Sequence, residues 1–227
     1  MSEYCTICGN KGLIPETDEP CECGCLEVSE IEGEITSLAI PEQYRDIVFN
    51  EVLVPMDLGD KYVKEIKNLY TDIVNLRLHN KNIFFGAPSR HSKTIMAYAS
   101  QCKLFRKGIE VFPLFDIREI GKIMQDIDFS RKPVYLEGLD TEPMILYTAP
   151  ILIVRLVGTA DWFTYETMVS LTSRRTRRGK DTIYLCDTSW EWFTENDKKG
   201  ILKSLVGDGS YGTIKNISFW KADATND

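Results

Sequence analysis

The spacing of hydrophobic and polar positions changes several times along the chain after residue 37. Residues 61–80 carry Val63, Ile66, Leu69 and Ile73 at intervals of three or four, which predicts an amphipathic helix. Short apolar runs between polar or glycine-containing stretches predict strands instead. The other predicted helices span 93–108, 116–128 and 162–178, and the predicted strands span 82–86, 109–115, 149–158, 181–189 and 215–222.

The order of these segments predicts the fold class. Strands that alternate with helices along a chain imply a parallel sheet with helices on both faces. The runs ILIV within 149–158 and TIYL within 181–189 are apolar throughout, which fits strands buried on both sides. We therefore predict an α/β domain with a parallel sheet flanked by helices.

The first 36 residues differ from the remainder. They are rich in cysteine and glycine, lack a long hydrophobic period, and end in the acidic stretch 27–35, EVSEIEGEI. This contrast predicts two parts, namely a small N-terminal module with an acidic linker over 1–36 and the α/β domain over 37–227.

Five of the seven cysteines fall within the first 25 residues. Cys5 and Cys8 form a C-x-x-C pair, and Cys21, Cys23 and Cys25 follow about a dozen residues later. Structural zinc takes four ligands in a tetrahedron, and two close pairs of thiolates supply them. We predict a structural zinc site made by the first two cysteines with Cys21 and Cys23, and with Cys25 as the alternate ligand. A redox pair or free thiols are the other interpretations of the cluster.

Composition and charge narrow the functional classes. The chain of 227 residues is 43% hydrophobic and 27% charged, which is typical of a folded globular protein. Its formal net charge of −7 argues against a surface that wraps duplex DNA, because such binding needs many Lys and Arg contacts to phosphate. No apolar run reaches the roughly 18–20 residues of a membrane helix, and the N-terminus is polar and acidic, unlike a signal peptide. We expect a cytoplasmic protein with no membrane partner.

A candidate nucleotide site follows the predicted strand 82–86. The stretch 84–94, FFGAPSRHSKT, ends in Lys-Thr, as the phosphate-binding pattern G-x-x-x-x-G-K-[ST] does. Gly86, Ser92, Lys93 and Thr94 are the candidate nucleotide-binding residues. The loop departs from the pattern, because five residues follow Gly86 and a serine holds the place of the second glycine.

The order of these features resembles one family. C-x-x-C, then C-x-C, then IPEQYRD at 40–46, then a helix, a strand and the phosphate-binding loop resemble the DnaC/DnaI-type AAA+ replicative-helicase loaders of bacteria and their phages, which are related to the IstB transposition ATPase. The resemblance covers residues 5–223. It implies an AAA+ domain, an N-terminal region that binds a partner, ATP held between neighbouring subunits, and a role in placing a hexameric helicase on single-stranded DNA.

Several residues depart from the family's catalytic pattern. The stretch ILIVRLVG, 151–158, matches the family's strand that ends in two acids, so that Val154 and Arg155 stand at the positions of the magnesium ligands. An acid, Asp187, stands at the polar sensor position. The nearest other acids, Glu137 and Asp140, lie earlier in the chain and have different spacing.

The arginines that the family places after the last helix are missing as well. Ser210 or Tyr211 stands at the position of the arginine finger, and the closing arginine is absent from the C-terminal stretch. These losses predict a catalytically degenerate loader-like protein, from a phage or mobile element, that acts as an interaction subunit in the initiation of DNA replication. Its expected partner is a replicative helicase or an active AAA+ relative, in a homo- or hetero-oligomer.

Other interpretations stay open at this stage. ATP or ADP with magnesium could still bind weakly through Lys93, or the chain could be an active ATPase that uses relocated acids. The chain could also be a zinc-bearing adaptor, or an inhibitor of a host's replication helicase.

A basic stretch, SRRTRRGK, spans 173–180. Contact with single-stranded DNA or with an acidic partner is one interpretation of these cations, and complementation of the helix dipole at a helix end is the other. The aromatic stretch SWEWF, 189–193, is interpreted as core, with a partner-facing surface as the alternative. The candidate contact residues of the basic stretch are Arg174, Arg175, Arg177, Arg178 and Lys180.

Overall fold

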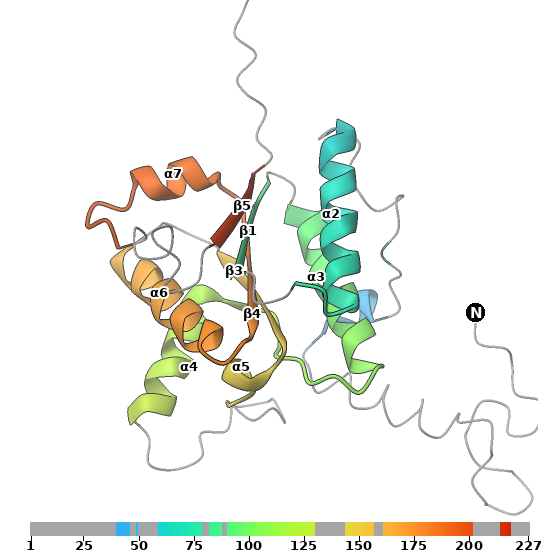
Figure 1. Cartoon of the computed structure of the whole chain (residues 1–227), viewed down its shortest axis with the longest axis horizontal. Helices are drawn as coiled ribbons and strands as arrows, with labels where there is room; N and C mark the ends of the chain where they lie inside the picture. Colours follow the sequence, from blue (N-terminus) through green and yellow to red (C-terminus); the bar gives the residue numbers. More distant parts are fainter. Residues whose placement is uncertain are drawn as a thin grey trace, which may run out of the picture.

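The computed structural model describes residues 40–45, 49, 59–78, 82–87, 90–129, 144–156, 161–201 and 214–218. Within these residues the chain forms one sheet of five parallel strands in the order β2-β3-β4-β1-β5 (Figure 1). The strands are β1 (Asn82–Gly86), β2 (Phe115–Asp116), β3 (Ile151–Leu156), β4 (Asp181–Cys186) and β5 (Ile214–Ser218). The helices are η2 (Glu42–Tyr44), α2 (Gly59–Val74), α3 (Arg90–Phe105), α4 (Ile117–Phe129), α5 (Ile145–Thr148), α6 (Trp162–Thr176) and α7 (Trp190–Glu195).

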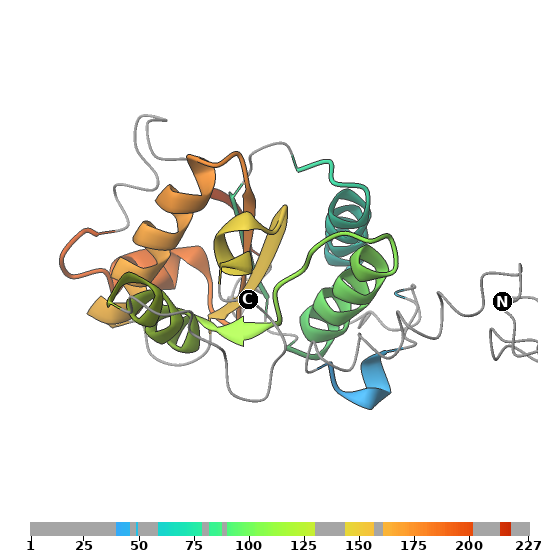
Figure 2. The same ribbon diagram turned by 90° about the horizontal axis from the view of Figure 1, so that it is seen from below.

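Helices cover both faces of the sheet. Helices α2 and α3 lie on one face, and α4, α5 and α6 lie on the other (Figure 2). The side chains of β3 alternate between the two cores, since Ile153 packs toward α2 and α3 while Leu152 and Val154 pack toward α4 and α6. The parallel α/β fold predicted from the apolar runs is therefore confirmed.

The order of the strands brings distant residues to one edge. β1 lies between β4 and β5, and Gly86 at its end is in register with Cys186 and Ser218. β3 also ends opposite Cys186, through Leu156. Because the strand order reverses beside β1, the carboxyl edge at this point is where open α/β sheets bind their ligands.

The short strand β2 and the unpredicted helices α5 and α7 differ from the pattern-based prediction. The strand expected over 109–115 is reduced to Phe115–Asp116, although Val111, Phe112 and Leu114 are buried. Pro113 explains the loss, because proline has no N–H to donate to a strand ladder. Helix α7 was not predicted, and Ser189 caps it by accepting a hydrogen bond from the backbone N–H of Trp192 at 3.1 Å.

The segment at 40–45 docks against α3. Tyr44 stacks on Tyr98 of α3 with ring centroids 4.9 Å apart, and the Arg106 side chain donates to the carbonyl oxygen of Arg45 at 3.1 Å. Among the residues that the structure describes, none of the helices is long and apolar enough to cross a membrane.

Candidate functional site

The four predicted nucleotide-binding residues lie at the junction of β1 and α3. Gly86 ends β1, and Ser92, Lys93 and Thr94 belong to the first turns of α3. Helix α3 begins at Arg90, two residues before Ser92, so part of the stretch expected as loop is helical. A strand followed by a helix N-terminus is the arrangement that phosphate-binding loops use.

The Lys93 side chain points to groups of the chain itself. It is only 3% exposed. Its Nζ donates to the carbonyl oxygens of Ala87 and, at 2.6 Å, Cys186, and lies 2.8 Å from Oδ1 of Asp187. An ammonium group has three N–H bonds, and three acceptors surround this one. A phosphate that approached Lys93 would have to displace one of them.

Asp187 supplies the charge at this contact. It directly follows β4, and its side chain is 39% exposed. Asp187, the acid at the sensor position, is therefore a neighbour of Lys93 in space. In the chain the two are far apart, since 93 residues separate Lys93 from Cys186, the residue before Asp187. A carboxylate beside the lysine opposes the binding of another anion there.

Cys186, at the end of β4, has a buried thiol. It is 1% exposed, and burial raises the pKa of its thiol above the ordinary value. The hydroxyl of Thr188 lies 3.0 Å from its Sγ. The thiol is therefore neutral at physiological pH and contributes no charge to this edge.

Ser92 turns away from the anion site and toward α2. Its hydroxyl makes a short hydrogen bond with the hydroxyl of Tyr62, and both residues are 0% exposed. The residue that replaces the family's second glycine therefore joins α2 to α3. Sequence reasoning missed Tyr62, because nothing in the spacing of α2 marks one buried tyrosine as a hydrogen-bond partner.

The two positions assigned to the magnesium ligands lie on opposite faces of β3. Val154 is 0% exposed within the core formed with α4 and α6, so its position is not open to a metal. Arg155 is half-buried on the α3 side, where its charge opposes the rise that burial causes in the pKa of Tyr98. Its Nε is buried and has no hydrogen-bond partner among the described residues.

Carboxylates that could replace the missing acids are committed or lie elsewhere. Asp116, in register with Arg155, accepts a hydrogen bond from the backbone N–H of Arg118 at 2.8 Å and so caps α4. Within the described ranges, no group of three or more His, Cys, Asp or Glu residues could hold a metal ion. This edge can attract an anion through Arg155, but its described side chains offer magnesium no carboxylate cluster.

The basic stretch is divided between the core and the surface. Arg175 is 0% exposed, and it donates to the carbonyl oxygens of Leu146 at 2.6 Å, Ala149 at 2.8 Å and Asp181 at 2.7 Å. The prediction that Arg175 contacts a partner or nucleic acid is therefore wrong. Burial lowers the pKa of this guanidinium to about 10, so it remains a cation at neutral pH.

The other cations of the stretch lie nearer the surface. Arg174 makes two hydrogen bonds with Asp128 of α4, at 2.8 and 2.7 Å, and lies over the ring of Tyr147. Arg178 lies over the same ring, 5.4 Å from its centroid, and is exposed. Arg177 is also exposed and Lys180 is half-buried, so these cations remain candidates for contact with a partner.

The aromatic stretch at 189–193 is divided in the same way. Phe193 is 2% exposed and belongs to the core, and Trp190 packs on Phe84 with ring centroids 4.9 Å apart. Trp192 is 39% exposed. The core interpretation is confirmed for Phe193, whereas Trp192 faces the solvent.

Several predicted residues lie outside the described part of the chain. They are the cysteine cluster, Glu137 and Asp140 as alternative acids, and Ser210 and Tyr211 at the arginine-finger position.

Comparison with known proteins supports the fold. The sequence matches no family model, and no curated protein matches it. The crystal structure of DnaI aligns with 80% of this chain and 92% of its own, with a TM-score of 0.51 and 13% identity. AMPPCP-bound DnaA from Aquifex aeolicus aligns over 78% of this chain and 51% of its own, with a TM-score of 0.46 and 9% identity. The chain shares the fold of DnaI, one of the proteins for which the resembled loader family is named.

Proposed function

We propose that this chain is a helicase-loader-like AAA+ protein that does not hydrolyse ATP and acts as an interaction subunit in the initiation of DNA replication. Its partner is a replicative helicase or an active AAA+ relative, and its place of action is the cytoplasm. The fold shared with DnaI and the order of sequence motifs support the loader-like role.

One observation carries the loss of hydrolysis. The ammonium of Lys93 is held by two backbone carbonyls and the carboxylate of Asp187, while Arg155 occupies the strand where the family carries acids. Hydrolysis by this class of protein needs a lysine on the phosphates and carboxylates that hold magnesium and orient water. This edge meets neither requirement among its described residues.

ATP turnover tests this proposal directly. The purified full-length chain is expected to release phosphate from Mg-ATP at the same background rate as its Lys93→Ala variant. Turnover that disappears in Lys93→Ala would refute the proposal. If that turnover also disappeared in Glu137→Gln or Asp140→Asn but persisted in Arg155→Ala, it would support the rival in which relocated acids hold the magnesium.

Nucleotide binding tests the role of Asp187. Asp187→Asn keeps the size of the side chain and removes the charge beside Lys93. A hydrogen bond to a charged group contributes about 1.5–3 kcal/mol, so the variant is expected to bind a fluorescent ADP analogue at least about tenfold more tightly than the wild type. Asp126→Asn, on the exposed face of α4, makes the same charge change and is expected to alter nothing. Equal affinities in all three proteins would show that Asp187 does not block the site.

The zinc prediction forms a separate part of the proposal. Cys5, Cys8, Cys21 and Cys23 would hold a structural zinc ion, with Cys25 as the alternate for one of the later pair. Metal analysis of the full chain is expected to give about one zinc per molecule. Cys5→Ser should lose the metal. Cys21, Cys23 and Cys25 are then replaced by serine one at a time, and the cysteine whose replacement leaves zinc bound is the one that is not a ligand.

Partner binding tests the adaptor role. The chain is expected to co-purify with the replicative helicase encoded in the same genome. Cys5→Ser should weaken this complex, because the N-terminal module carries the contact, and Lys93→Ala should leave it intact. A complex that needs Lys93 but not Cys5 would contradict the proposed division of labour.

A further inference from the structure

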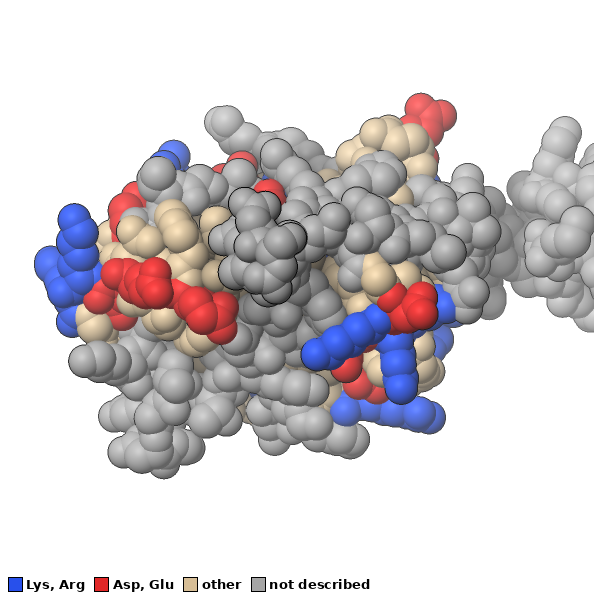
Figure 3. All heavy atoms as spheres, turned by 90° about the horizontal axis from the view of Figure 1, so that it is seen from above, with Lys and Arg blue, Asp and Glu red and all other residues tan. Residues whose placement is uncertain are grey.

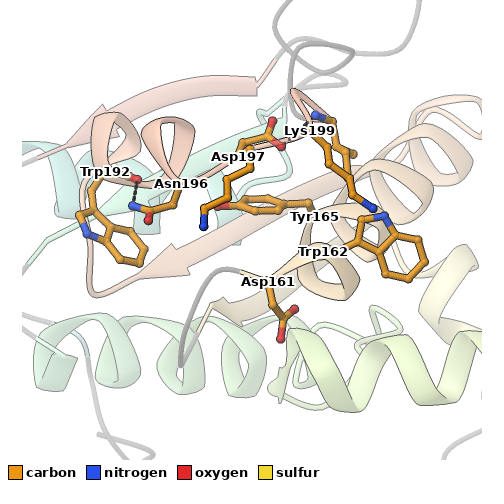
Figure 4. A pocket seen from close by; sticks show the side chains of 9 residues that line it. Asp161, Trp162, Tyr165, Trp192, Asn196, Asp197 and Lys199 are labelled. Carbon is orange, nitrogen blue, oxygen red and sulfur yellow. Dashed lines mark hydrogen bonds between the residues drawn. The ribbon is translucent and has the colours of Figure 1, made fainter.

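A pocket of about 400 Å³ lies between the first turn of α6 and the segment that follows α7 (Figure 4). It is on the side of the sheet that carries α4 and α6, whereas Lys93 lies on α3. Its volume suits one small ligand or one unit of a polymer. None of the candidate nucleotide-binding residues at the start of α3 lines it.

Two exposed indole rings bound this pocket. Trp162 is 49% exposed and Trp192 is 39% exposed, and they lie at its two ends with Tyr165 between them (Figure 4). Large apolar side chains that are exposed number four among the described residues, and two of the four line this one pocket. Exposed rings gathered at a concave site are typical of a binding surface.

The floor of the pocket is fixed in place. The hydroxyl of Tyr165 donates to the carbonyl oxygen of Phe193 at 2.8 Å. The rings of Tyr165 and Phe193 pack edge to face, with centroids 5.1 Å apart. Burial, reinforced by the nearby carboxylates of Asp197 and Asp161, raises the pKa of Tyr165 to about 12, so the floor carries no charge. A ligand would meet a floor that is already ordered.

The two carboxylates that line the pocket are occupied by neighbouring groups. Asp161 accepts from the backbone N–H of Thr164 at 2.9 Å and pairs with Arg118. Asp197 accepts from the backbone N–H of Ile201 at 2.9 Å. These bonds satisfy part of their negative charge from within the chain.

The two lysines that line the pocket, Lys198 and Lys199, differ in their surroundings. The ammonium of Lys199 lies 5.1 Å from the centroid of the Trp162 ring, and both side chains line the pocket (Figure 4). The Lys198 side chain is exposed and makes no ion pair with a described residue. The pocket therefore combines planar apolar rings with ammonium groups available to an anion.

We propose that this pocket binds a nucleotide unit, with its base stacked on Trp192 or Trp162 and its phosphate beside Lys198 and Lys199. Stacking on aromatic rings next to cations is how proteins hold unpaired nucleotides without regard to sequence. The face seen in Figure 3 carries both acidic and basic side chains. Only two lysines line the pocket itself, so the contact involves one or two phosphates. The unit belongs either to a single strand or to a free nucleotide.

The experiment uses the full-length chain and three probes. They are a single-stranded oligothymidylate of about a dozen nucleotides, an abasic strand of the same length, and thymidine monophosphate. The oligothymidylate is expected to bind at least about tenfold more tightly than the abasic strand, because one stacked base contributes roughly 1–3 kcal/mol. If the monophosphate also binds, and loses affinity in the same variants, the ligand is a free nucleotide; if it does not bind, the ligand is a strand.

Variants separate this pocket from the basic stretch at the far end of α6. Of Trp192→Ala and Trp162→Ala, the variant that removes the stacking ring should weaken binding about tenfold. Phenylalanine at the same position should weaken it much less, because it keeps a ring for stacking. Lys198→Gln should reduce the slope of log K against log salt by about 0.7, the value for one phosphate of a single strand. Arg178→Gln should change neither quantity. Thermal unfolding of each variant establishes that it is folded.

Three results would overturn the inference. The first is equal binding of the abasic and thymidylate strands, which would exclude stacking. The second is loss of binding in Arg178→Gln with no change in folded tryptophan variants, which would assign the contact to the basic stretch. The third is that neither the oligothymidylate nor thymidine monophosphate binds. The exposed rings would then be interpreted as a protein-docking surface.

Discussion

The Arg175 side chain places a cation inside the domain, where neutral oxygen atoms accept its hydrogen bonds. Three backbone carbonyls and the hydroxyl of Thr182 receive its hydrogen bonds, and they belong to α5, to the turn before β3 and to the first two residues of β4. A buried charge is tolerated only when such bonds replace its hydration. Arg175 therefore joins α5 and α6 to the amino end of β4.

Arg175→Leu should destabilise the domain strongly. The change leaves the carbonyl oxygens of Leu146, Ala149 and Asp181 without this donor, and each unsatisfied buried group costs about 1–3 kcal/mol. We expect the free energy of unfolding in urea to fall by about 3 kcal/mol or more. Arg177→Leu, at an exposed position of the same stretch, should stay within about 0.5 kcal/mol of the wild type. Similar losses in the two variants would contradict the structural role.

The burial of Arg175 was within reach of sequence reasoning. It follows Met168, Leu171 and Thr172 by seven, four and three residues, which places it on the buried stripe of a helix. Treating the four arginines as one group hid this difference between faces. The contact of Lys93 with Asp187 was not within reach in the same way, because it depends on which strands are neighbours and not on local spacing.

Helices α4 and α6 approach closely at Gly121. A Cβ atom built there would lie 2.5 Å from Cζ of Phe163 and 2.8 Å from Oγ1 of Thr167. In an open helix, glycine to alanine stabilises by about 1 kcal/mol. Here we expect Gly121→Ala to destabilise by about 1–3 kcal/mol, because the added methyl group overpacks the contact.

A second variant tests the cause of that destabilisation. Phe163→Leu shortens the side chain that the new methyl group would meet. Combined with Gly121→Ala, it should recover part of the lost unfolding free energy, so that the two changes are not additive. Strict additivity would show that the loss has another origin.

The same pair of helices is linked by Arg174 and Asp128. The hydrogen bonds from Arg174 lower the pKa of the Asp128 carboxyl below its ordinary value. The folded state therefore binds this proton less readily than the unfolded state does, so the contribution is present above about pH 4 and is lost as pH falls through the lowered pKa. The pair is partly exposed, and its contribution is at most about 1 kcal/mol.

Acid unfolding of Asp128→Asn checks this contribution. The variant lacks the titrating group, so its stability should fall less steeply than that of the wild type below about pH 4. The difference in unfolding free energy between the two proteins should be largest near neutral pH. A difference that grew in acid would reverse the sign and contradict the assignment.

Pattern reasoning located the elements better than their limits. Continuous apolar runs identified β1, β3 and β4, because strands buried on both faces need apolar side chains on both faces. It overestimated the length of β2, because the residues around Pro113 are buried but do not pair with a neighbouring strand. It missed α7, whose six residues are too few to show a helical period.

At the scale of the molecule, the zinc proposal predicts two separable parts. A chelator should remove zinc from the N-terminal module, whose short cysteine-rich sequence provides little apolar surface for folding. The α/β domain should keep its near-ultraviolet circular dichroism and its thermal midpoint, because two cores of its own stabilise it. A large drop in that midpoint on chelation would show that the two parts fold as one unit.

The hydrogen bond between Ser92 and Tyr62 has a mechanical consequence. It couples the start of α3 to the first turn of α2 through two side chains with no exposed surface. A ligand that moved the first turn of α3 toward β4 would also displace the buried side chain of Tyr62 from its packing. Rearrangement of this corner is thus a concerted movement of two helices, and a serine-to-glycine exchange would uncouple them.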